Sequence, residues 1–365
     1  MILRHLALTN FKNIAEANLD FSPKINCLLG DNGMGKSNLL DAIHFLSFAR
    51  SFGRVPDSLL IRNGEDFAIV RGDYLRGDTD EEITASLRRG ARKSFRRGGK
   101  EYPRLSSHIG LIPAVMVAPA DLTLATAAPE ERRRFVDMII SQSDTAYLDA
   151  LIRYNHALEQ RNRLLRDEHP DAALMATVEM MMAAAADVIV RRRSTFAEEL
   201  SAIFAPYYAQ IAGASEQPAL RYLPSADGPL EAALEASRRR DILLRHTTVG
   251  PHRDDMEFTL DGMPLKLTAS QGQTKTFTIA LRLAQYEFLR RFTGRNPLLL
   301  LDDIFDKLDS RRVRNIMEIV RLDSFGQIFI TDTNRKHLDE IIEACGNDYR
   351  LWNVDCGTFT SITRQ

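Results

Sequence analysis

The spacing of apolar and polar residues divides the chain into a strand-rich first part, a helical middle and a mixed last part. Residues 2–8 alternate as a strand does, and a second strand-like stretch runs to Phe21. Further short strands are predicted at 67–74, 82–89 and 93–95, where glycines separate the apolar runs. This spacing predicts an antiparallel patch of sheet.

From about residue 143 the spacing becomes helical, and leucines recur every seven residues from Leu151 onward. A break at residues 168–171 separates this helix from a second one that is predicted to end near Phe204. Two helices of roughly 24–30 residues form a hairpin arm on the order of 35–45 Å long. An ordinary helical subdomain is the alternative that this pattern leaves open.

Turn residues dominate 206–229, and helical spacing then returns over 230–244. A strand is predicted at 256–260, with a hairpin turn at Asp261-Gly262. A long amphipathic helix is predicted over 274–292.

Residues 25–40 carry the pattern of a phosphate-binding loop. An apolar run breaks at Gly30, and an apolar helix starts after Ser37, which is the context that G-x-x-x-x-G-K-[ST] requires. Its glycines let backbone N–H groups turn toward an anion, and the helix adds its positive end. Lys36 is predicted to reach the β- and γ-phosphates, and Ser37 to hold Mg²⁺. The predicted ATP-binding residues are Gly30, Asp31, Asn32, Gly33, Met34, Gly35, Lys36, Ser37 and Asn38.

A second part of the same site is predicted at residues 298–303, where two acids follow four leucines. A buried parallel strand that ends in a carboxylate is where a P-loop ATPase holds its Mg²⁺. Asp302 is therefore a predicted metal ligand together with Ser37. Asp303 is predicted to orient or deprotonate the attacking water, which makes Lys36 and Asp303 the predicted catalytic residues. Two acids that merely end a strand are the alternative.

Composition limits the class of protein. At 365 residues the chain exceeds one compact core, so two lobes are expected. No apolar window is expected to approach the ~18 residues of a membrane-spanning helix. The three cysteines are scattered and have no metal-ligand spacing, which indicates a reducing compartment and a cytoplasmic location.

The net charge of −1 says nothing about nucleic acid, but the distribution of charge does. Residues 88–104 hold eight basic side chains and one acid. A basic run is often only a solvated face. Several such clusters in a nearly neutral chain favour a phosphate-binding surface. The predicted DNA-binding residues are Arg92, Lys93, Arg96 and Arg97.

The sequence Gly250-Pro251-His252-Arg253-Asp254-Asp255 predicts a sharp turn before a strand. Its adjacent acids are compatible with a metal site. Because no third ligand lies nearby in the sequence, turn chemistry and the polarity of a strand end are the favoured interpretation.

The order of these motifs resembles the ATP-binding-cassette ATPases, and within them the RecF family of recombination-repair proteins. The motifs typical of the whole class are the phosphate loop, S-Q-G-Q at 270–273, LLLLDD at 298–303 and DKLD at 306–309. Three motifs distinguish the narrower RecF family within this class: ERRRFVD at 131–137, QRNRLL at 160–165 and GPHRDD at 250–255.

The resemblance implies an α/β fold related to the heads of chromosome-organising proteins. It predicts an ATPase head, with a mixed sheet and an antiparallel β subdomain, formed by residues 1–140 and 242–365. A helical arm with a short antiparallel hairpin, residues 141–241, is inserted into this head.

The resemblance also implies function. Two heads would dimerise around ATP and Mg²⁺, and slow, DNA-dependent hydrolysis would release duplex, gapped or single-stranded DNA. Ser270, Gly272 and Gln273 would contact ATP held by the partner copy, and Leu308 and Asp309 would form a dimer-contact loop. Such a protein would help to load recombinase at single-strand gaps, support the SOS response, and work with other recombination-mediator proteins, away from membranes.

The chain departs from the usual pattern of these ATPases at three positions. No histidine that could sense the γ-phosphate lies near 331–333, so Thr331 or Thr333 takes that place by position. No glutamine lies in 117–124, where Asp121 is the nearest candidate for Mg²⁺. Asp303 stands where glutamate is more usual.

Two other functions fit parts of this pattern less well. One is the ATPase subunit of a membrane transporter, which has far less sequence between the phosphate loop and the S-Q-G-Q helix. The other is a chromosome-organising protein with long coiled coils, for which the predicted arm is too short and lacks the cysteine pair of a zinc hook. The resemblance favours the DNA-binding switch.

Overall fold

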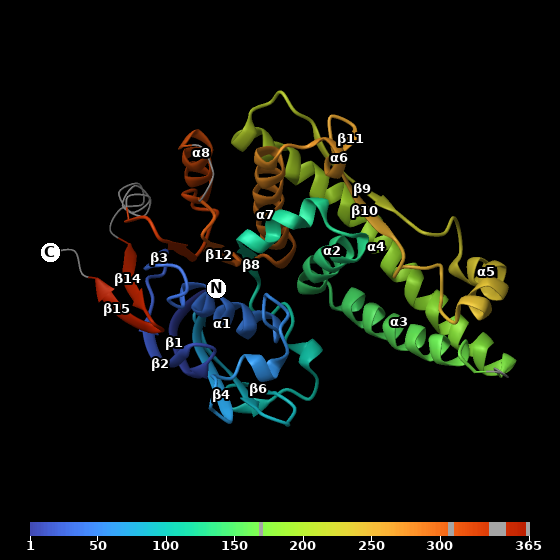
Figure 1. Cartoon of the computed structure of the whole chain (residues 1–365), viewed down its shortest axis with the longest axis horizontal. Helices are drawn as coiled ribbons and strands as arrows, with labels where there is room; N and C mark the ends of the chain where they lie inside the picture. The colour runs from blue at the N-terminus through green and yellow to red at the C-terminus, as the bar shows by residue number, and fades with distance from the viewer. Residues whose placement is uncertain (168–170, 306–309, 336–347, 363–365) are drawn as a thin grey trace. The chain divides into compact units, whose positions relative to one another are not determined.

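The computed structural model describes residues 1–167, 171–305, 310–335 and 348–362 (Figure 1). The chain forms two compact units, residues 1–121 with 285–365 (unit 1) and residues 122–284 (unit 2). These limits differ from the predicted domains, since residues 122–140 and 242–284 group with the helical unit. Compactness alone does not define a domain, so the predicted domain limits stay a prediction.

Unit 1 is built on two six-stranded sheets. The antiparallel sheet contains β1 (Ile2–Phe11), β2 (Ile14–Asp20), β4 (Phe67–Arg76), β5 (Thr79–Arg88), β6 (Ser94–Arg97) and β7 (Lys100–Glu101). The mixed sheet contains β3 (Ile25–Leu29), β8 (Ala114–Val117), β12 (Leu298–Asp302), β13 (Ile328–Asp332), β14 (Tyr349–Asp355) and β15 (Thr358–Ile362). Their strand orders are β2-β1-β4-β5-β6-β7 and β15-β14-β3-β13-β12-β8. The predicted combination of a mixed sheet with an antiparallel β subdomain is confirmed.

Helix α1 (Lys36–Phe48) lies between these two sheets and contacts β4 and β5 of one and β8, β12 and β13 of the other. Eleven of its 13 residues are buried, including the polar Asp41, His44 and Ser47. The Phe45 ring packs 5.4 Å from the Phe95 ring on β6, and Lys93 Nζ lies 5.7 Å from the centroid of Phe45. The helix that follows the phosphate loop therefore contacts β6 and the lysine just before it directly.

Unit 2 is mainly helical and carries a small antiparallel sheet. Its elements are α2 (Pro129–Ser143), α3 (Thr145–Leu164), α4 (Ala172–Ala212), β9 (Pro218–Leu223), α5 (Leu230–Leu244), β10 (Asp255–Leu260), β11 (Met263–Pro264) and α6 (Leu265–Thr268). Helices α3 and α4 pack along each other and confirm the predicted hairpin (Figure 1). The remaining helices are α7 (Gln271–Thr293), which begins in unit 2 and ends in unit 1, α8 (Ser310–Val320), and the 3-10 helices η1 (Asp57–Leu59), η2 (Leu105–Ser107) and η3 (Pro119–Thr126).

Helix α4 continues beyond its predicted end near Phe204 and passes through Pro206. The prediction that 206–229 is turn-rich is wrong for the rest of α4 and for β9. A proline inside a helix costs about 3 kcal/mol. Packing offsets this cost, because the rings of Phe204 and Tyr208 lie 4.7 and 6.1 Å from that of Phe277. Burial of one aromatic ring is worth about 1.5–3 kcal/mol.

Helix α4 also contains a window long and apolar enough to cross a membrane, with a mean hydropathy of 1.8. The expectation that no such window exists is therefore wrong. The same helix carries the buried Glu179, which pairs with Arg161 of α3 at 2.9 Å. Arg161 is fully buried and also pairs with Asp241 of α5 at 2.7 Å. Buried charges need such partners, and these ion pairs hold α4 against α3 and α5 within unit 2.

Candidate nucleotide site and its surroundings

The phosphate loop joins β3 to α1 and is held by Asn13 from the turn between β1 and β2. Gly35 has φ 115°, and a Cβ there would lie 2.9 Å from the Asn13 side chain, so only glycine fits. The Asn13 amide donates to the Met34 carbonyl at 3.3 Å, and Asn38 donates to Asn13 Oδ1 at 2.7 Å. Asn13 was not among the predicted site residues, although it lies in the sequence N-F-K-N-I at 10–14.

Lys36, the first residue of α1, folds its side chain back over the loop. Its Nζ donates to the carbonyl oxygens of Gly30 and, at 2.8 Å, Asp31. Burial lowers the pKa of Lys36, while the nearby Asp303 and Asp302 raise it. The ammonium group is partly desolvated, and phosphate oxygens would be stronger acceptors for it than these carbonyls.

Ser37 and Asp302 meet at the carboxyl end of β12. Ser37 Oγ donates to Asp302 Oδ1 at 2.8 Å, and Thr331 Oγ1 donates to the same oxygen at 2.7 Å. Asp302 and Thr331 are register partners on neighbouring parallel strands. Burial raises the pKa of Asp302, and the hydrogen bonds from Thr331 and Ser37 oppose that shift.

These residues suit a magnesium ion. Mg²⁺ prefers oxygen ligands and is usually held by one or two carboxylates together with substrate phosphates. Ser37 offers a hydroxyl oxygen and Asp302 a carboxylate. Burial disfavours the charge of Asp302, and a cation beside it would stabilise that charge. Within the described part of the chain, no group of three or more His, Cys, Asp or Glu side chains could hold a metal on its own.

Asp303 follows β12 directly and has φ 47°, a left-handed conformation that Asp and Asn tolerate better than most residues. Its backbone N–H donates to Thr331 Oγ1 at 3.0 Å. Thr331 therefore contacts both predicted acids of the site. The alternative candidate, Thr333, is exposed.

Asp121 lies in the turn at η3, and its carboxylate accepts a hydrogen bond from the Ala118 backbone N–H at 3.0 Å. This contact closes the turn after β8. A role for Asp121 at Mg²⁺ stays a prediction.

Ser270 and Gln273 form a capping box at the start of α7. Ser270 N–H donates to Gln273 Oε1 at 2.8 Å, and Gln273 N–H donates to Ser270 Oγ at 3.2 Å. The Gln273 amide also donates to Glu216 at 2.8 Å, a contact that the sequence did not reveal. Gly272 lies in the first turn of the helix, and Ser270 is exposed. The three residues predicted to contact a partner's ATP thus share one fixed helix N-terminus.

The predicted dimer-contact residues Leu308 and Asp309 lie outside the described residues.

The four predicted DNA-binding residues differ in their surroundings. Lys93 and Arg97 form ion pairs with acidic side chains of unit 1. Arg92 and Arg96 are exposed, and neither has an ion pair within the described ranges. The two exposed arginines are therefore the ones available to an incoming phosphate.

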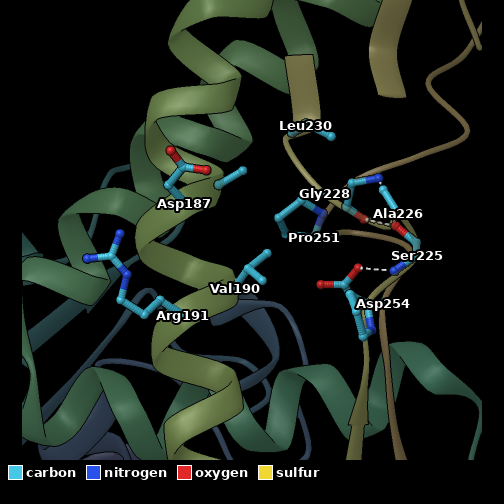
Figure 2. A pocket seen from close by; sticks show the side chains of 12 residues that line it. Asp187, Val190, Arg191, Ser225, Ala226, Gly228, Leu230, Pro251 and Asp254 are labelled. Carbon is cyan, nitrogen blue, oxygen red and sulfur yellow. Dashed lines mark hydrogen bonds between the residues drawn. The ribbon is translucent and has the colours of Figure 1, made fainter. Parts of the chain in front are cut away.

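The two acidic side chains at the turn before β10 bond to other groups of the protein. This is expected if the sequence forms a turn and not a metal site. Asp254 is buried and accepts from the Ser225 backbone N–H at 2.8 Å, which Figure 2 shows as a dashed line. Asp254 also pairs with Arg193 at 3.3 Å, and Asp255 pairs with Arg132 at 2.7 Å.

Comparison with known proteins defines the class first. The family model of the RecF/RecN/SMC N terminal domain matches residues 2–349. An Smc head domain derived from Pyrococcus furiosus has the same fold, with a TM-score of 0.58 at 18% identity over 99% of this chain and 96% of that one. The fold is thus that of an ATP-binding-cassette head of the RecF and SMC type.

Relatives then define the family. The DNA replication and repair protein RecF of Parabacteroides distasonis is 49% identical over 358 residues, 98% of both chains. RecF of Porphyromonas gingivalis is 48% identical over 360 residues, 98% of this chain and 99% of that one. A solved structure described as the recombination mediator protein RecF-ATP in the RecFOR pathway has a TM-score of 0.90 at 28% identity, over 99% of this chain and 98% of that one. This chain belongs to the RecF family of DNA replication and repair proteins.

Proposed function

We propose that this protein is an ATP-driven DNA-binding switch of recombinational repair and replication restart. The observation that carries the proposal is the meeting of Ser37, Asp302 and Thr331 behind a complete phosphate loop. A solved RecF relative is described with ATP, which supports the choice of nucleotide.

Each side chain of the site has a proposed task. Lys36 would neutralise the β- and γ-phosphates, and Ser37 with Asp302 would hold Mg²⁺, which would supply further positive charge to the phosphates. Asp303 orients the attacking water or accepts its proton. Thr331 fixes the positions of both acids through its hydroxyl group.

The site is proposed to be completed by a second copy of the chain. The capped N-terminus of α7 is an anion-binding feature, and Ser270, Gly272 and Gln273 would present it to ATP held by the partner. Leu308 and Asp309 are proposed to lie at the same interface. Because ATP would then bind the dimer better than the monomer, it would shift the population to dimer, and slow hydrolysis would reverse the shift.

Light scattering tests this proposal directly. Saturating ATP with Mg²⁺ is expected to double the mass of wild-type protein in solution, whereas ADP with Mg²⁺ is expected to leave it unchanged. ATP and ADP share the phosphate-loop contacts, so ADP controls for nucleotide binding without the γ-phosphate. A single-copy mass with ATP at every protein concentration would contradict the shared site.

The DNA contact is proposed to include strand β6 and the turn before it. Replacing Arg92 and Arg96 with glutamine is expected to weaken binding of duplex DNA and to reduce the slope of log K against log salt by about 2, because two phosphate contacts are lost. The matched control replaces Lys93 and Arg97, which removes the same formal charge from residues already paired with acids.

Fluorescence anisotropy over a series of salt concentrations measures both quantities. The control pair is expected to lose less affinity than the exposed pair, and all four replacements together are expected to weaken binding most. An unchanged salt slope for the exposed pair would remove this strand from the DNA interface.

The wider role is proposed on family membership. The protein would help to load recombinase at single-strand gaps, support the SOS response and act with other recombination mediators, in the cytoplasm. The relative described as a mediator in the RecFOR pathway supports this assignment. Similarity to RecF over nearly the whole chain disfavours the alternative of a transporter subunit.

A further inference from the structure

A polar cavity of about 370 Å³ lies within unit 2, where the motifs that single out the family converge. Helix α2 contributes part of E-R-R-R-F-V-D, α3 contributes residues just before Q-R-N-R-L-L, and the turn before β10 contributes part of G-P-H-R-D-D. The nucleotide site uses none of these residues. The polar lining includes Arg133, Arg134, Asn155, Arg193, His252 and Arg253.

The acids around this cavity are already occupied by two of its arginines. Arg134 pairs with Glu130 and with Glu131 at 2.5 Å. Arg193 is buried and pairs with Asp137 at 2.8 Å. These contacts neutralise the carboxylates that line the cavity.

The other two arginines have only carbonyl partners among the described residues. Arg133 donates to the backbone oxygen of Asp254, and Arg253 donates to that of Thr247 at 3.3 Å. Burial lowers the pKa of Arg133 and the nearby Arg193 acts in the same direction, while Asp254, Asp137 and Asp255 oppose the shift. The carboxylates near Arg133 are each ion-paired with another arginine. A half-buried guanidinium in such surroundings is one that a further anion would stabilise.

The turn that presents Arg253 is rigid. His252 is neutral in its surroundings, since burial lowers its pKa to about 4. Its Nε2 donates to the Thr247 carbonyl at 3.1 Å, which leaves Nδ1 to accept from the Tyr154 hydroxyl at 2.7 Å. A Cβ on Gly250 would lie 2.5 Å from that hydroxyl, so the turn requires glycine to approach Tyr154. The ring braces the turn and adds no charge to the cavity.

We propose that this cavity binds a phosphate group of the DNA backbone through Arg133 and Arg253, an inference that rests on the DNA binding proposed above. Guanidinium groups bind phosphate through two parallel hydrogen bonds, which carbonyl partners cannot replace. The cavity lies within the range of about 300–1,000 Å³ of small-ligand sites, so it has room for more than a bare ion. A site built on charge positions the DNA without reading its sequence.

Arg253→Gln is the most informative variant, because Arg253 is exposed and its loss leaves the packing of unit 2 intact. With ATP saturating in every sample, so that the phosphate loop is filled, duplex DNA binding is followed by anisotropy against salt. The expected result is a loss of affinity of at least about threefold and a salt slope reduced by about 0.9. Arg133→Gln is expected to act in the same direction, and Arg253→Lys is expected to restore part of the affinity.

The matched control is Arg239→Gln, an exposed arginine on α5 that does not line the cavity. It removes the same charge from the same unit and is expected to change binding little. In addition, inorganic phosphate is expected to displace DNA from the wild type more strongly than chloride does at equal ionic strength. For Arg253→Gln, phosphate and chloride are expected to displace DNA equally.

The outcomes separate the two proposals. Wild-type protein that does not bind DNA would contradict the proposed function itself. Wild-type binding with equal losses in Arg253→Gln and Arg239→Gln would overturn only the cavity, since charge alone would explain the result. If Arg253→Gln bound DNA normally but lost binding to a poly-glutamate peptide, the occupant would be an acidic protein and the inference would be wrong.

Discussion

Lys36→Ala is expected to abolish ATP-dependent dimerisation and to lower the rate of ATP hydrolysis by at least about 10²–10³-fold, the usual effect of removing a group that stabilises charge in a transition state. The expected loss is large because the ammonium group lies over the loop, partly desolvated, with its charge aimed at the place of the phosphates. Phosphate release measures hydrolysis, and light scattering measures the mass of the complex.

Lys100→Ala is the control for this variant, because Lys100 is an exposed lysine of unit 1 outside the nucleotide site. Both variants are expected to unfold close to the wild-type temperature. Among the described residues, Lys36 Nζ bonds to the carbonyls of Gly30 and Asp31, which water can reach once the side chain is shortened. If Lys36→Ala formed ATP-dependent dimers as the wild type does, another residue would bind the terminal phosphates.

Asp303→Asn is expected to keep ATP binding and to lower hydrolysis by about 10²–10⁴-fold, the range for loss of a general base. The change removes the charge and preserves the shape. Asparagine tolerates φ 47° as well as aspartate does, and the backbone N–H that bonds to Thr331 is unaltered. The protein should therefore stay dimeric long after ATP is added, whereas wild-type dimers should dissociate as ATP is consumed.

Single-turnover hydrolysis and light scattering over time measure the two effects separately. Asp73→Asn, a change at a partly exposed acid on β4, provides the control and should behave as the wild type does. Hydrolysis at the normal rate in Asp303→Asn would assign the water-orienting role to another residue.

Parts of the site were predictable because their residues are contiguous. The strand, loop and helix of residues 25–48 follow one another in the chain, and so do the leucines and acids of 298–303. Asn13 and Thr331 hold these segments from elements that lie elsewhere in the sequence. The resemblance named Thr331 or Thr333 by position, but no local pattern shows that Thr331 contacts both acids or that an asparagine in a turn supports the loop.

The same limit explains what was missed elsewhere. Basic residues 92–97 look equivalent in the sequence, and only the fold brings the acids to Lys93 and Arg97 and leaves Arg92 and Arg96 exposed. Pro206 predicts a break, but the tertiary contacts of Phe204 and Tyr208 outweigh that local preference. Long-range packing decides such positions.

The place of α1 between two sheets has a thermodynamic consequence. One end of the helix forms the phosphate loop's C-terminal part, and the Phe45 ring near its other end contacts Phe95 on β6 and Lys93 just before that strand. If nucleotide shifts this helix and so changes the affinity for DNA by some factor, linkage requires DNA to change the affinity for nucleotide by the same factor. A DNA lesion that recruits the protein would then also raise its affinity for ATP. No separate nucleotide-exchange protein would be needed.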